Sequence, residues 1–361
     1  MKQRQPREAP VARRPIARRP AARSAALRLA ELMPLRHIAP MSPTSQTHVI
    51  FGAGQIGAPL AQMLAKRGHN VRMIRRSPGT APQGVQLRTG DAGDATFVAE
   101  ATSGASVLYH CMNPEYSTAS WARELPRLRE AMRTAAAQHG ARIVLLDNLY
   151  MLGRPRGTLL SETSPIDPCS KKGEIRAREW QAWLDAHRAG DVRVTCGRGS
   201  DFYGPGATQS YFGDSFMPKA LGSHTALTLT RLDTPHSYHY THDIAEGLAT
   251  LGEAGDDAYG RWWMLPAAQA ESTQAMIDRL GSAMGHELKV QSMPSVAIKG
   301  LSLFMPVLRE LGEMGYQWSE PFVADDRAFR RVFMGTATSL DDGARAMVEW
   351  ARQHYAAQMK V

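Results

Sequence analysis

The stretch HVIFGAGQIG, residues 48–57, decides the fold of this chain. Its apolar start predicts a buried strand, and its glycines predict a tight turn directly after that strand. Residues 58–68, APLAQMLAKRG, follow with apolar side chains at helical spacing, and residues 70–76, NVRMIRR, return to a strand pattern. A strand, a glycine turn, a helix and a second strand make a βαβ unit, which begins a parallel sheet.

Strand patterns continue to alternate with helical patterns up to about residue 205. The strand candidates are residues 85–87, 106–109, 142–146 and 192–195. This alternation predicts an α/β fold with a Rossmann-type doubly wound parallel sheet. Beyond residue 205 the alternation loosens, which indicates a smaller C-terminal substrate lobe that interleaves with the first. We therefore expect a tail over 1–45, a Rossmann domain over 46–205 with a later contribution from about 231–265, and the C-terminal lobe over 206–361.

The chain has 361 residues and a formal net charge of +9, and this charge gathers in an N-terminal tail. Residues 1–40 contain ten Lys or Arg against two acidic residues, so the rest of the chain is close to neutral. Repeated Arg-Arg-Pro cannot build a core and predicts disorder. Three interpretations stay open: a start placed before a true initiator at Met41, a targeting segment, and an arm that binds nucleic acid or a membrane surface.

The remaining composition is that of a globular protein, with 43% hydrophobic and 21% charged residues. No stretch reaches the roughly 20 apolar residues of a membrane span, so we expect no membrane partner. The folded body has no basic footprint for nucleic acid, and a homodimer is compatible with the sequence. Its three cysteines lack metal-ligand spacing, and no secretory signal is visible. These features favour a reduced, cytoplasmic setting.

Gly52, Gly54 and Gly57 form a GxGxxG pattern between the first strand and the first helix. Gly52 permits the tight turn, Gly54 lets the backbone approach a pyrophosphate, and Gly57 allows the helix to pack closely on the sheet. The anion would rest on the helix N-terminus, where N–H groups and the dipole favour negative charge. We therefore predict that this turn, with Gln55 and Ile56, holds a nicotinamide dinucleotide; the alternative is a purely structural glycine turn.

The end of the second strand distinguishes the two nicotinamide cofactors, because an acidic residue there binds the ribose 2′-OH of NAD. Here the chain has Arg75, Arg76 and Ser77, which suit a 2′-phosphate. We therefore predict NADP(H), with NAD(H) as the alternative. Asp91 follows the third strand and either meets the adenine edge or caps a helix. Cys111 follows the fourth strand at the ligand-binding edge, where packing against the cofactor is favoured over a nucleophilic role.

Four stretches resemble the extended short-chain dehydrogenase/reductases of the NAD-dependent epimerase/dehydratase type. They are VIFGAGQIG (49–57), TGDAGDATFV (89–98), GRGSDFYGPGA (197–207) and HSYHYTHDIAEGLATL (236–251). The likeness extends from about residue 46 to the end of the chain. The glycine turn departs from the family pattern GxxGxxG, since it is one residue tighter.

The resemblance implies a Ser or Thr after the fifth strand and a Tyr four residues before a Lys, which binds the ribose and lowers the phenol pKa. Asn148 stands at the Ser position and still offers a hydrogen bond to a carbonyl oxygen. Lys172 matches the Lys, but Pro168 stands where the Tyr belongs. The chain is therefore similar to atypical members with a degraded active-site tetrad. Tyr150 is the nearest candidate for proton transfer.

The remaining patterns carry weaker alternatives. Tyr203 is a second phenol after the sixth strand, and Asp147 either orients a neighbour or caps its turn. The histidines of 236–242 recur every third residue, but in a strand His239 would face away from His236 and His242, so we expect no metal site. The apolar residues expected to form a substrate wall are Trp262, Trp263, Phe304, Met305, Met314, Tyr316 and Trp318.

Together these patterns favour an NAD(P)(H)-dependent oxidoreductase or epimerase that acts on a carbonyl or alcohol of a small, apolar substrate. The degraded tetrad leaves a second hypothesis open, a non-catalytic NADP(H)-binding sensor or scaffold.

Overall fold

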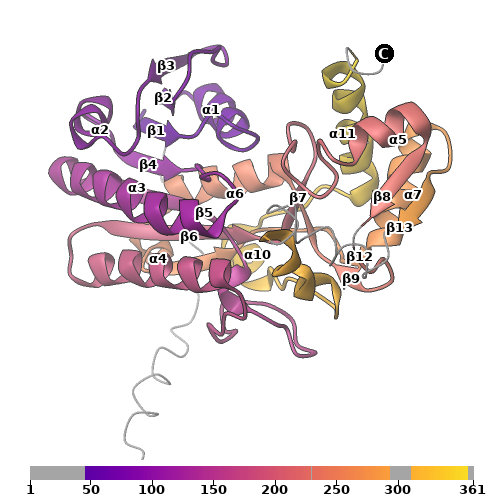
Figure 1. The fold of residues 1–361 in the computed structure, drawn as a ribbon. Helices are drawn as coiled ribbons and strands as arrows, with labels where there is room; N and C mark the ends of the chain where they lie inside the picture. The colour runs from indigo at the N-terminus through magenta and orange to yellow at the C-terminus, as the bar shows by residue number, and fades with distance from the viewer. Residues whose placement is uncertain (1–44, 229, 293–309, 357–361) are drawn as a thin grey trace, which may run out of the picture. The chain divides into compact units, whose positions relative to one another are not determined.

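The central sheet has seven parallel strands. The computed structural model describes residues 45–228, 230–292 and 310–356, so nearly all of the predicted tail, as well as Phe304 and Met305, lies outside the described residues. The strand order is β11-β6-β5-β4-β1-β2-β3 (Figure 1). The strands are β1 (Thr47–Phe51), β2 (Asn70–Arg75), β3 (Val85–Thr89), β4 (Val107–His110), β5 (Arg142–Asn148), β6 (Arg193–Gly199) and β11 (Arg261–Met264).

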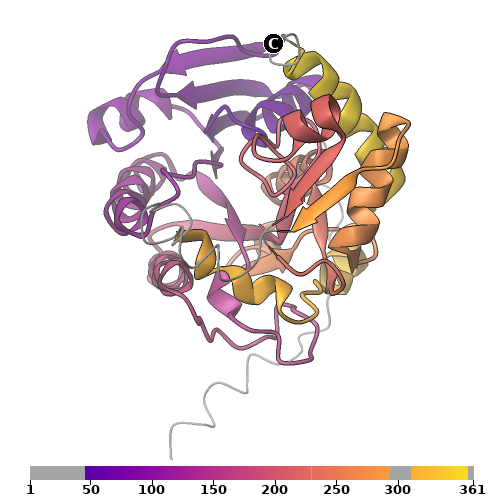
Figure 2. The same cartoon turned by 45° about the vertical axis from the view of Figure 1, so that its right-hand side comes forward.

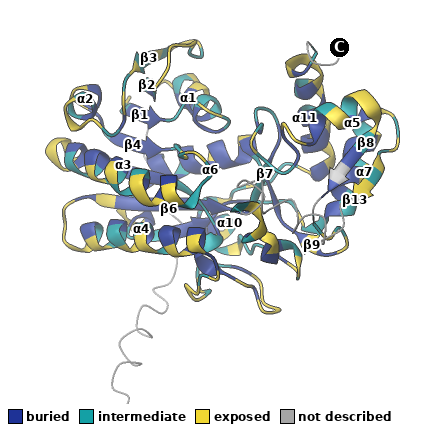
Figure 3. Ribbon diagram, in the orientation of Figure 1, coloured by how far each residue is buried: buried dark blue, intermediate teal, exposed yellow. Residues whose placement is uncertain are grey.

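Helices cover both faces of this sheet. One face packs against α1 (Gly57–Lys66) and α6 (Thr241–Glu253), and the other packs against α2 (Ala95–Ala101), α3 (Thr118–His139) and α4 (Lys171–Arg188). In Figure 3 these helices turn buried sides toward the sheet and exposed sides away from it. The doubly wound Rossmann-type fold predicted from the alternating pattern is therefore confirmed.

The last strand of the sheet comes from a late part of the chain. β11 pairs with β6, and Trp263 is fully buried. The expectation that Trp262 and Trp263 form a substrate wall is therefore wrong, because both residues belong to the central sheet and its cores. An apolar run that follows the sixth strand of a parallel sheet therefore indicates a further buried strand rather than the wall of a cleft.

A second core lies beside the sheet and gathers α5 (Met217–Ser223), α7 (Thr273–Met284) and α11 (Leu340–His354). Two short parallel strands, β8 (Thr225–Thr228) and β13 (Lys289–Ser292), accompany these helices. α7 and α11 lie side by side in Figures 1 and 2. The predicted start of α7 at Ser272 is confirmed, since the Ser272 hydroxyl accepts a hydrogen bond from the Ala275 amide at 3.2 Å.

The remaining elements are short. They are β7 (Asp201–Tyr203), β9 (Pro235–His236), β10 (Tyr238–Tyr240), β12 (Glu271–Ser272), α10 (Arg327–Phe333) and the 3-10 turns η1 (Tyr150–Leu152), η2 (Asp256–Ala258) and η3 (Gly315–Trp318). Within the described part of the chain, none of the helices combines the length and the apolar character that a bilayer crossing requires.

Candidate active site

The glycine turn after β1 uses its three glycines in different ways. Gly52 adopts φ +106°, and a side-chain carbon there would lie 2.7 Å from the carbonyl oxygen of Cys111. A side-chain carbon at Gly57 would lie 1.7 Å from the Gly52 carbonyl oxygen. Gly54 is exposed, and in the described part of the chain no heavy atom beyond its two chain neighbours lies within 4 Å of its added carbon. Gly52 and Gly57 are therefore needed to close the turn, whereas Gly54 leaves open space above it.

The N-terminus of α1 follows this open space directly. Its first residue is Gly57, and Ile56 before it provides no side-chain cap. The first turn of α1 also contains no acidic residue that would neutralise the helix dipole. Such an end, with uncapped N–H groups beside an open glycine, has the features of a phosphate site. Gln55 lies close to the loop after β7, since a side-chain carbon at Gly206 would be 3.5 Å from the Gln55 Cα atom.

Arg75 and Arg76 stand at the end of β2, the strand next to β1. Arg75 is half-buried and its guanidinium lies over Gly79, whereas Arg76 is exposed. Among the described residues, neither guanidinium has a hydrogen bond or an ion pair. Both groups are therefore available to a ligand that lies along the carboxyl edge of β1 and β2.

Asp91 follows β3 and is tied to a neighbouring helix. Its carboxylate pairs with Arg127 at 2.9 Å and accepts a hydrogen bond from the Gly93 amide at 2.9 Å. These two partners, helped by the charge of Arg76, lower the pKa of Asp91. Asp94 caps α2 by accepting hydrogen bonds from the Thr96 and Phe97 amides, which leaves Asp91 as the acidic group at this edge.

Cys111 contributes its backbone rather than its thiol to the glycine turn. Its carbonyl packs against Gly52, and its amide bonds the Phe51 carbonyl at 2.8 Å. Burial raises the pKa of the Cys111 thiol to about 12. The thiol therefore stays protonated at neutral pH, which disfavours a nucleophilic role.

The three cysteines should react with a thiol reagent in two classes. Burial raises the pKa of all three thiols, to about 12 in Cys111 and Cys196, but among the three only Cys169 is exposed. In a disulfide-exchange assay at mildly alkaline pH, we expect Cys169 to react rapidly in the native protein and the other two only after unfolding. Rapid native labelling that persists in a Cys169→Ser variant would contradict this assignment.

Asn148 and Tyr150 lie at the carboxyl end of β5 and in the η1 turn after it. The Asn148 side-chain oxygen accepts a hydrogen bond from the Tyr150 amide at 3.1 Å, which leaves its amide group as the donor side. The Tyr150 ring stacks on Trp121 with centroids 6.2 Å apart. Its hydroxyl lies 3.5 Å from that of Tyr116, and burial raises the pKa of Tyr150 to about 12. Tyr150 is therefore a proton donor at neutral pH.

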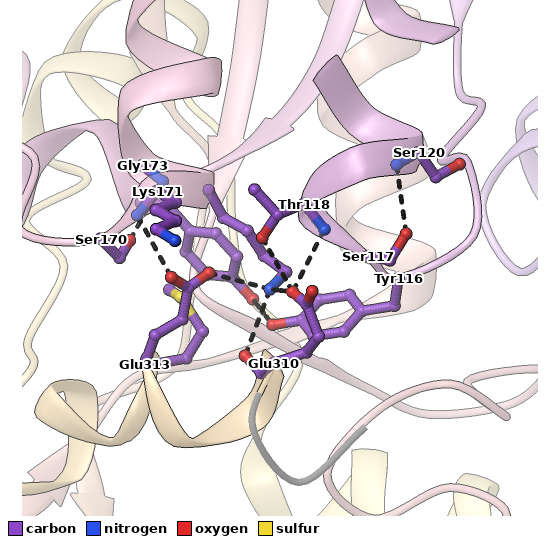
Figure 4. Close-up of polar contacts among 12 residues, drawn as sticks. Tyr116, Ser117, Thr118, Ser120, Ser170, Lys171, Gly173, Glu310 and Glu313 are labelled. Carbon is purple, nitrogen blue, oxygen red and sulfur yellow. Dashed lines mark hydrogen bonds and ion pairs between the residues drawn. The ribbon is translucent and has the colours of Figure 1, made fainter. Parts of the chain in front are cut away.

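Lys172 lies in the first turn of α4 and is completely buried. Its ammonium group bonds the carboxylates of Glu310 and Glu313, the latter at 2.8 Å, and lies 4.7 Å from the centre of the Tyr116 ring. Glu310 also accepts hydrogen bonds from the Thr118 amide and hydroxyl at 3.1 and 2.9 Å (Figure 4). Burial opposes the ionisation of Glu310, but the hydrogen bonds from Lys172 and Thr118 lower its pKa overall.

The structure thus brings together the phenols of Tyr116 and Tyr150 and the ammonium group of Lys172. Tyr116 touches both Tyr150 and Lys172, although the three residues come from different segments. The two glutamates neutralise the Lys172 charge that would otherwise lower a nearby phenol pKa. Tyr203 takes no part, because it is buried in the second core with Tyr238.

Sequence reasoning missed Tyr116, Glu310 and Glu313. Tyr116 stands six residues beyond the end of β4, and its place after a strand at the ligand edge was an available signal. The two glutamates gave no such signal, because they meet Lys172 from about 140 residues further along the chain.

The histidines of 236–242 do not all lie on one strand, because β10 ends at Tyr240 and His242 lies in α6. His236 pairs with Asp201 at 2.6 Å, and His239 accepts a hydrogen bond from the Ser200 amide at 3.0 Å. Among the described residues, no group of three or more potential ligands is placed to hold a metal ion.

Comparisons with known proteins agree with this arrangement. Residues 52–191 match the family model described as NAD(P)H-binding. UDP-glucuronic acid 4-epimerase from Bacillus cereus in complex with NAD has a TM-score of 0.71 at 16% identity, covering 86% of this chain and 99% of that chain. UDP-glucose 4-epimerase from Thermotoga maritima with UDP-glucose has a TM-score of 0.68 at 14% identity, covering 85% and 99%. An epimerase from Methanothermobacter thermautotrophicus has a TM-score of 0.70 at 14% identity, covering 88% and 94%.

No curated protein matches the sequence. At these identities the structural likeness shows the fold, and the family match concerns the cofactor domain. The predicted resemblance to extended short-chain dehydrogenase/reductases is therefore confirmed for the fold, while the degraded tetrad stays a prediction.

Proposed function

We propose that this chain, which combines an NAD(P)H-binding domain over residues 52–191 with the fold of NAD-dependent epimerases, is an NADP(H)-dependent oxidoreductase or epimerase. The observation that carries the proposal is the glycine turn. Gly52 and Gly57 are required by its geometry, whereas Gly54 opens onto the uncapped N-terminus of α1. Gln55 and Ile56 complete the stretch that would cradle the pyrophosphate.

The preference for NADP(H) is supported by the guanidiniums of Arg75 and Arg76, which form no hydrogen bond or ion pair with any described residue. A 2′-phosphate beside them would gain charge-assisted hydrogen bonds, whereas the ribose hydroxyl of NAD would not. Asp91 is paired with Arg127 and lies after β3, where its carboxylate would meet the adenine side of the cofactor. The carbonyl of Cys111 would line the turn from below.

A nicotinamide cofactor, when bound, supplies hydride transfer to or from the carbon of a carbonyl or alcohol. Asn148 would steady the oxygen on that carbon with its amide group, and Tyr150, which stays protonated, would donate the proton. Tyr116 would relay that proton, since its hydroxyl is the neighbour of Tyr150. Lys172 would bind the cofactor ribose once its ammonium is released by Glu310 and Glu313.

Neutralising the two glutamates should strengthen cofactor binding. In the double variant Glu310→Gln, Glu313→Gln, Lys172 keeps hydrogen-bond acceptors but loses two competing charges. We expect the NADPH dissociation constant to fall about tenfold, in line with the roughly 1.5–3 kcal/mol of a hydrogen bond to a charged group. The measurement is a nicotinamide fluorescence titration.

The matched control is Glu174→Gln, which removes a carboxylate from the exposed side of the same helix. It should leave the dissociation constant unchanged. If the double variant stays folded and binds NADPH no better than the native chain, Lys172 is a structural residue and has no role toward the ribose.

A second candidate function is an NADP(H)-binding sensor or scaffold without turnover. One argument for it is that the ammonium group of Lys172 is already paired with Glu310 and Glu313. Another is that Pro168 stands at the position where the resemblance implies a tyrosine. The same cofactor contacts would serve this function, and only the proton-transfer groups would be idle.

Turnover distinguishes the two functions. The nicotinamide absorbance band would be followed across a panel of apolar ketones and secondary alcohols. For UDP-glucose and UDP-glucuronic acid, the ligands of the structural neighbours, the epimers would be separated and quantified instead, because an epimerase returns the hydride to its substrate and leaves no net change in this band. A rate that falls in Tyr150→Phe supports the oxidoreductase, which we expect to prefer the small apolar compounds. Saturable cofactor binding without a rate for any substrate would favour the sensor.

A further inference from the structure

A small cavity lies beside the proposed cofactor site, between the carboxyl ends of three strands and the inner side of α4. Its volume is about 30 Å³, and its lining includes His110, Asp147, Arg176, Trp180, Trp183 and Arg198. A cavity needs only about 10–15 Å³ to hold a water molecule, so this space is large enough for a small ligand.

Two buried guanidiniums line this cavity with donors that have no partner. Arg198 is fully buried and Arg176 is 7% exposed. Both pair with Asp147, at 3.0 and 3.2 Å. Among the described residues, the Nε and Nη2 atoms of Arg198 and the Nε atom of Arg176 lack a hydrogen-bond acceptor. Buried donors of this kind are costly unless something accepts from them.

The charges around the cavity do not balance either. Asp147 is shared by two guanidiniums, and the neighbouring carboxylate of Glu179 is already paired with Arg129 at 2.9 Å. Glu179 and Arg129 balance each other, so the guanidiniums of Arg176 and Arg198 are left with one carboxylate, that of Asp147. His110 does not change this count, because burial and then the charge of Arg176 lower its pKa to about 4, which keeps the ring neutral. One positive charge remains without a counter-charge in a largely buried site.

We propose that this cavity binds one small monovalent inorganic anion of the size of chloride. The unpaired N–H groups of Arg176 and Arg198 would donate to it, and the indole walls would exclude larger, hydrated oxyanions. The site is separate from the glycine turn. It is connected to the proposed chemistry through Arg198, whose Nη1 atom also donates to the Asn148 carbonyl at 2.6 Å. A bound anion would therefore hold the end of β5 in place.

Halide dependence tests this proposal on the full chain. Thermal unfolding would be compared in sodium chloride, sodium bromide and sodium gluconate at equal ionic strength. We expect a saturable rise in Tm of about 2 °C or more in the two halides, because a ligand that binds only the native state stabilises it. Iodide should quench the fluorescence of the Trp180 and Trp183 side chains with the same saturation. Identical curves in halide and gluconate would overturn the site and leave only water in the cavity.

Charge variants identify the place of binding. Arg176→Gln removes the excess charge and should abolish the halide-dependent rise, whereas Asp147→Asn adds to the excess and should lower the halide concentration at half effect. Arg193→Gln is the control, because it removes an exposed charge at the far end of the same strand as Arg198. A rise that persists unchanged in Arg176→Gln would overturn the assignment. If the variants fail to fold, an anomalous bromide signal in crystals of the native chain decides: a peak in the cavity supports the site, and an empty cavity overturns it.

Discussion

Replacing Gly54 with valine is expected to weaken NADPH binding at least about 100-fold while leaving thermal stability close to that of the native chain. Among the described residues, and apart from the two chain neighbours of Gly54, no heavy atom lies within 4 Å of a carbon added at this position, so the turn tolerates the side chain. The valine would, however, fill the space where the pyrophosphate approaches the backbone. Isothermal titration with NADPH and a thermal melt on the same preparation measure the two effects.

Two glycine variants serve as comparisons for Gly54→Val. Gly57→Val should lose stability as well as binding, because its first side-chain carbon would collide with the Gly52 carbonyl oxygen at 1.7 Å. Gly222→Ala, in α5 and with no described residue outside its own helix within 4 Å of the added carbon, should change neither property. Normal NADPH affinity in a folded Gly54→Val variant would show that the cofactor does not lie over this turn.

The second large effect concerns cofactor choice. The double variant Arg75→Ala, Arg76→Ala should lose about 10- to 100-fold in NADPH affinity, since each charge-assisted hydrogen bond to a phosphate is worth roughly 1.5–3 kcal/mol and the groups are partly solvated. NADH lacks the 2′-phosphate, so its affinity should change by less than about threefold on the same argument. Parallel fluorescence titrations with the two reduced cofactors give the ratio.

Arg88→Ala is the control for the loss of a positive charge near the proposed cofactor edge. Arg88 lies on the adjacent strand β3, and its guanidinium is turned toward the Glu100 carbonyl at 3.3 Å and the Phe97 ring. It should lower the affinity for both cofactors equally and only slightly. If the double variant Arg75→Ala, Arg76→Ala lost affinity for NADH and NADPH equally, these guanidiniums would attract both cofactors by their charge and would not bind the 2′-phosphate.

The geometry of the proposed cofactor edge was predictable from the sequence because its determinants are local. The glycine spacing, the flanking strand and helix, and Arg75 at the strand end all lie within 30 residues, and the fold places them as the βαβ pattern implies. The same local logic located the capping residue of α7. Where the pattern was only apolar, as at Trp262 and Trp263, it did not distinguish a buried strand from a cleft wall.

The surroundings of Lys172 were not predictable in this way. Its neighbours Tyr116, Glu310 and Glu313 come from segments about 55 to 140 residues away, and only tertiary packing brings them together. The sharing of Asp147 between Arg176 and Arg198 has the same origin. Pairings between distant ionised residues follow no sequence period, so a single sequence gives no means of locating them.

Direct titration of the full chain with NADPH and with NADH, by calorimetry, tests the central claim most directly. The account predicts saturable binding at one site per chain, with NADPH bound more tightly than NADH. Heats that fail to saturate with either cofactor, from a protein shown to be folded, would contradict it.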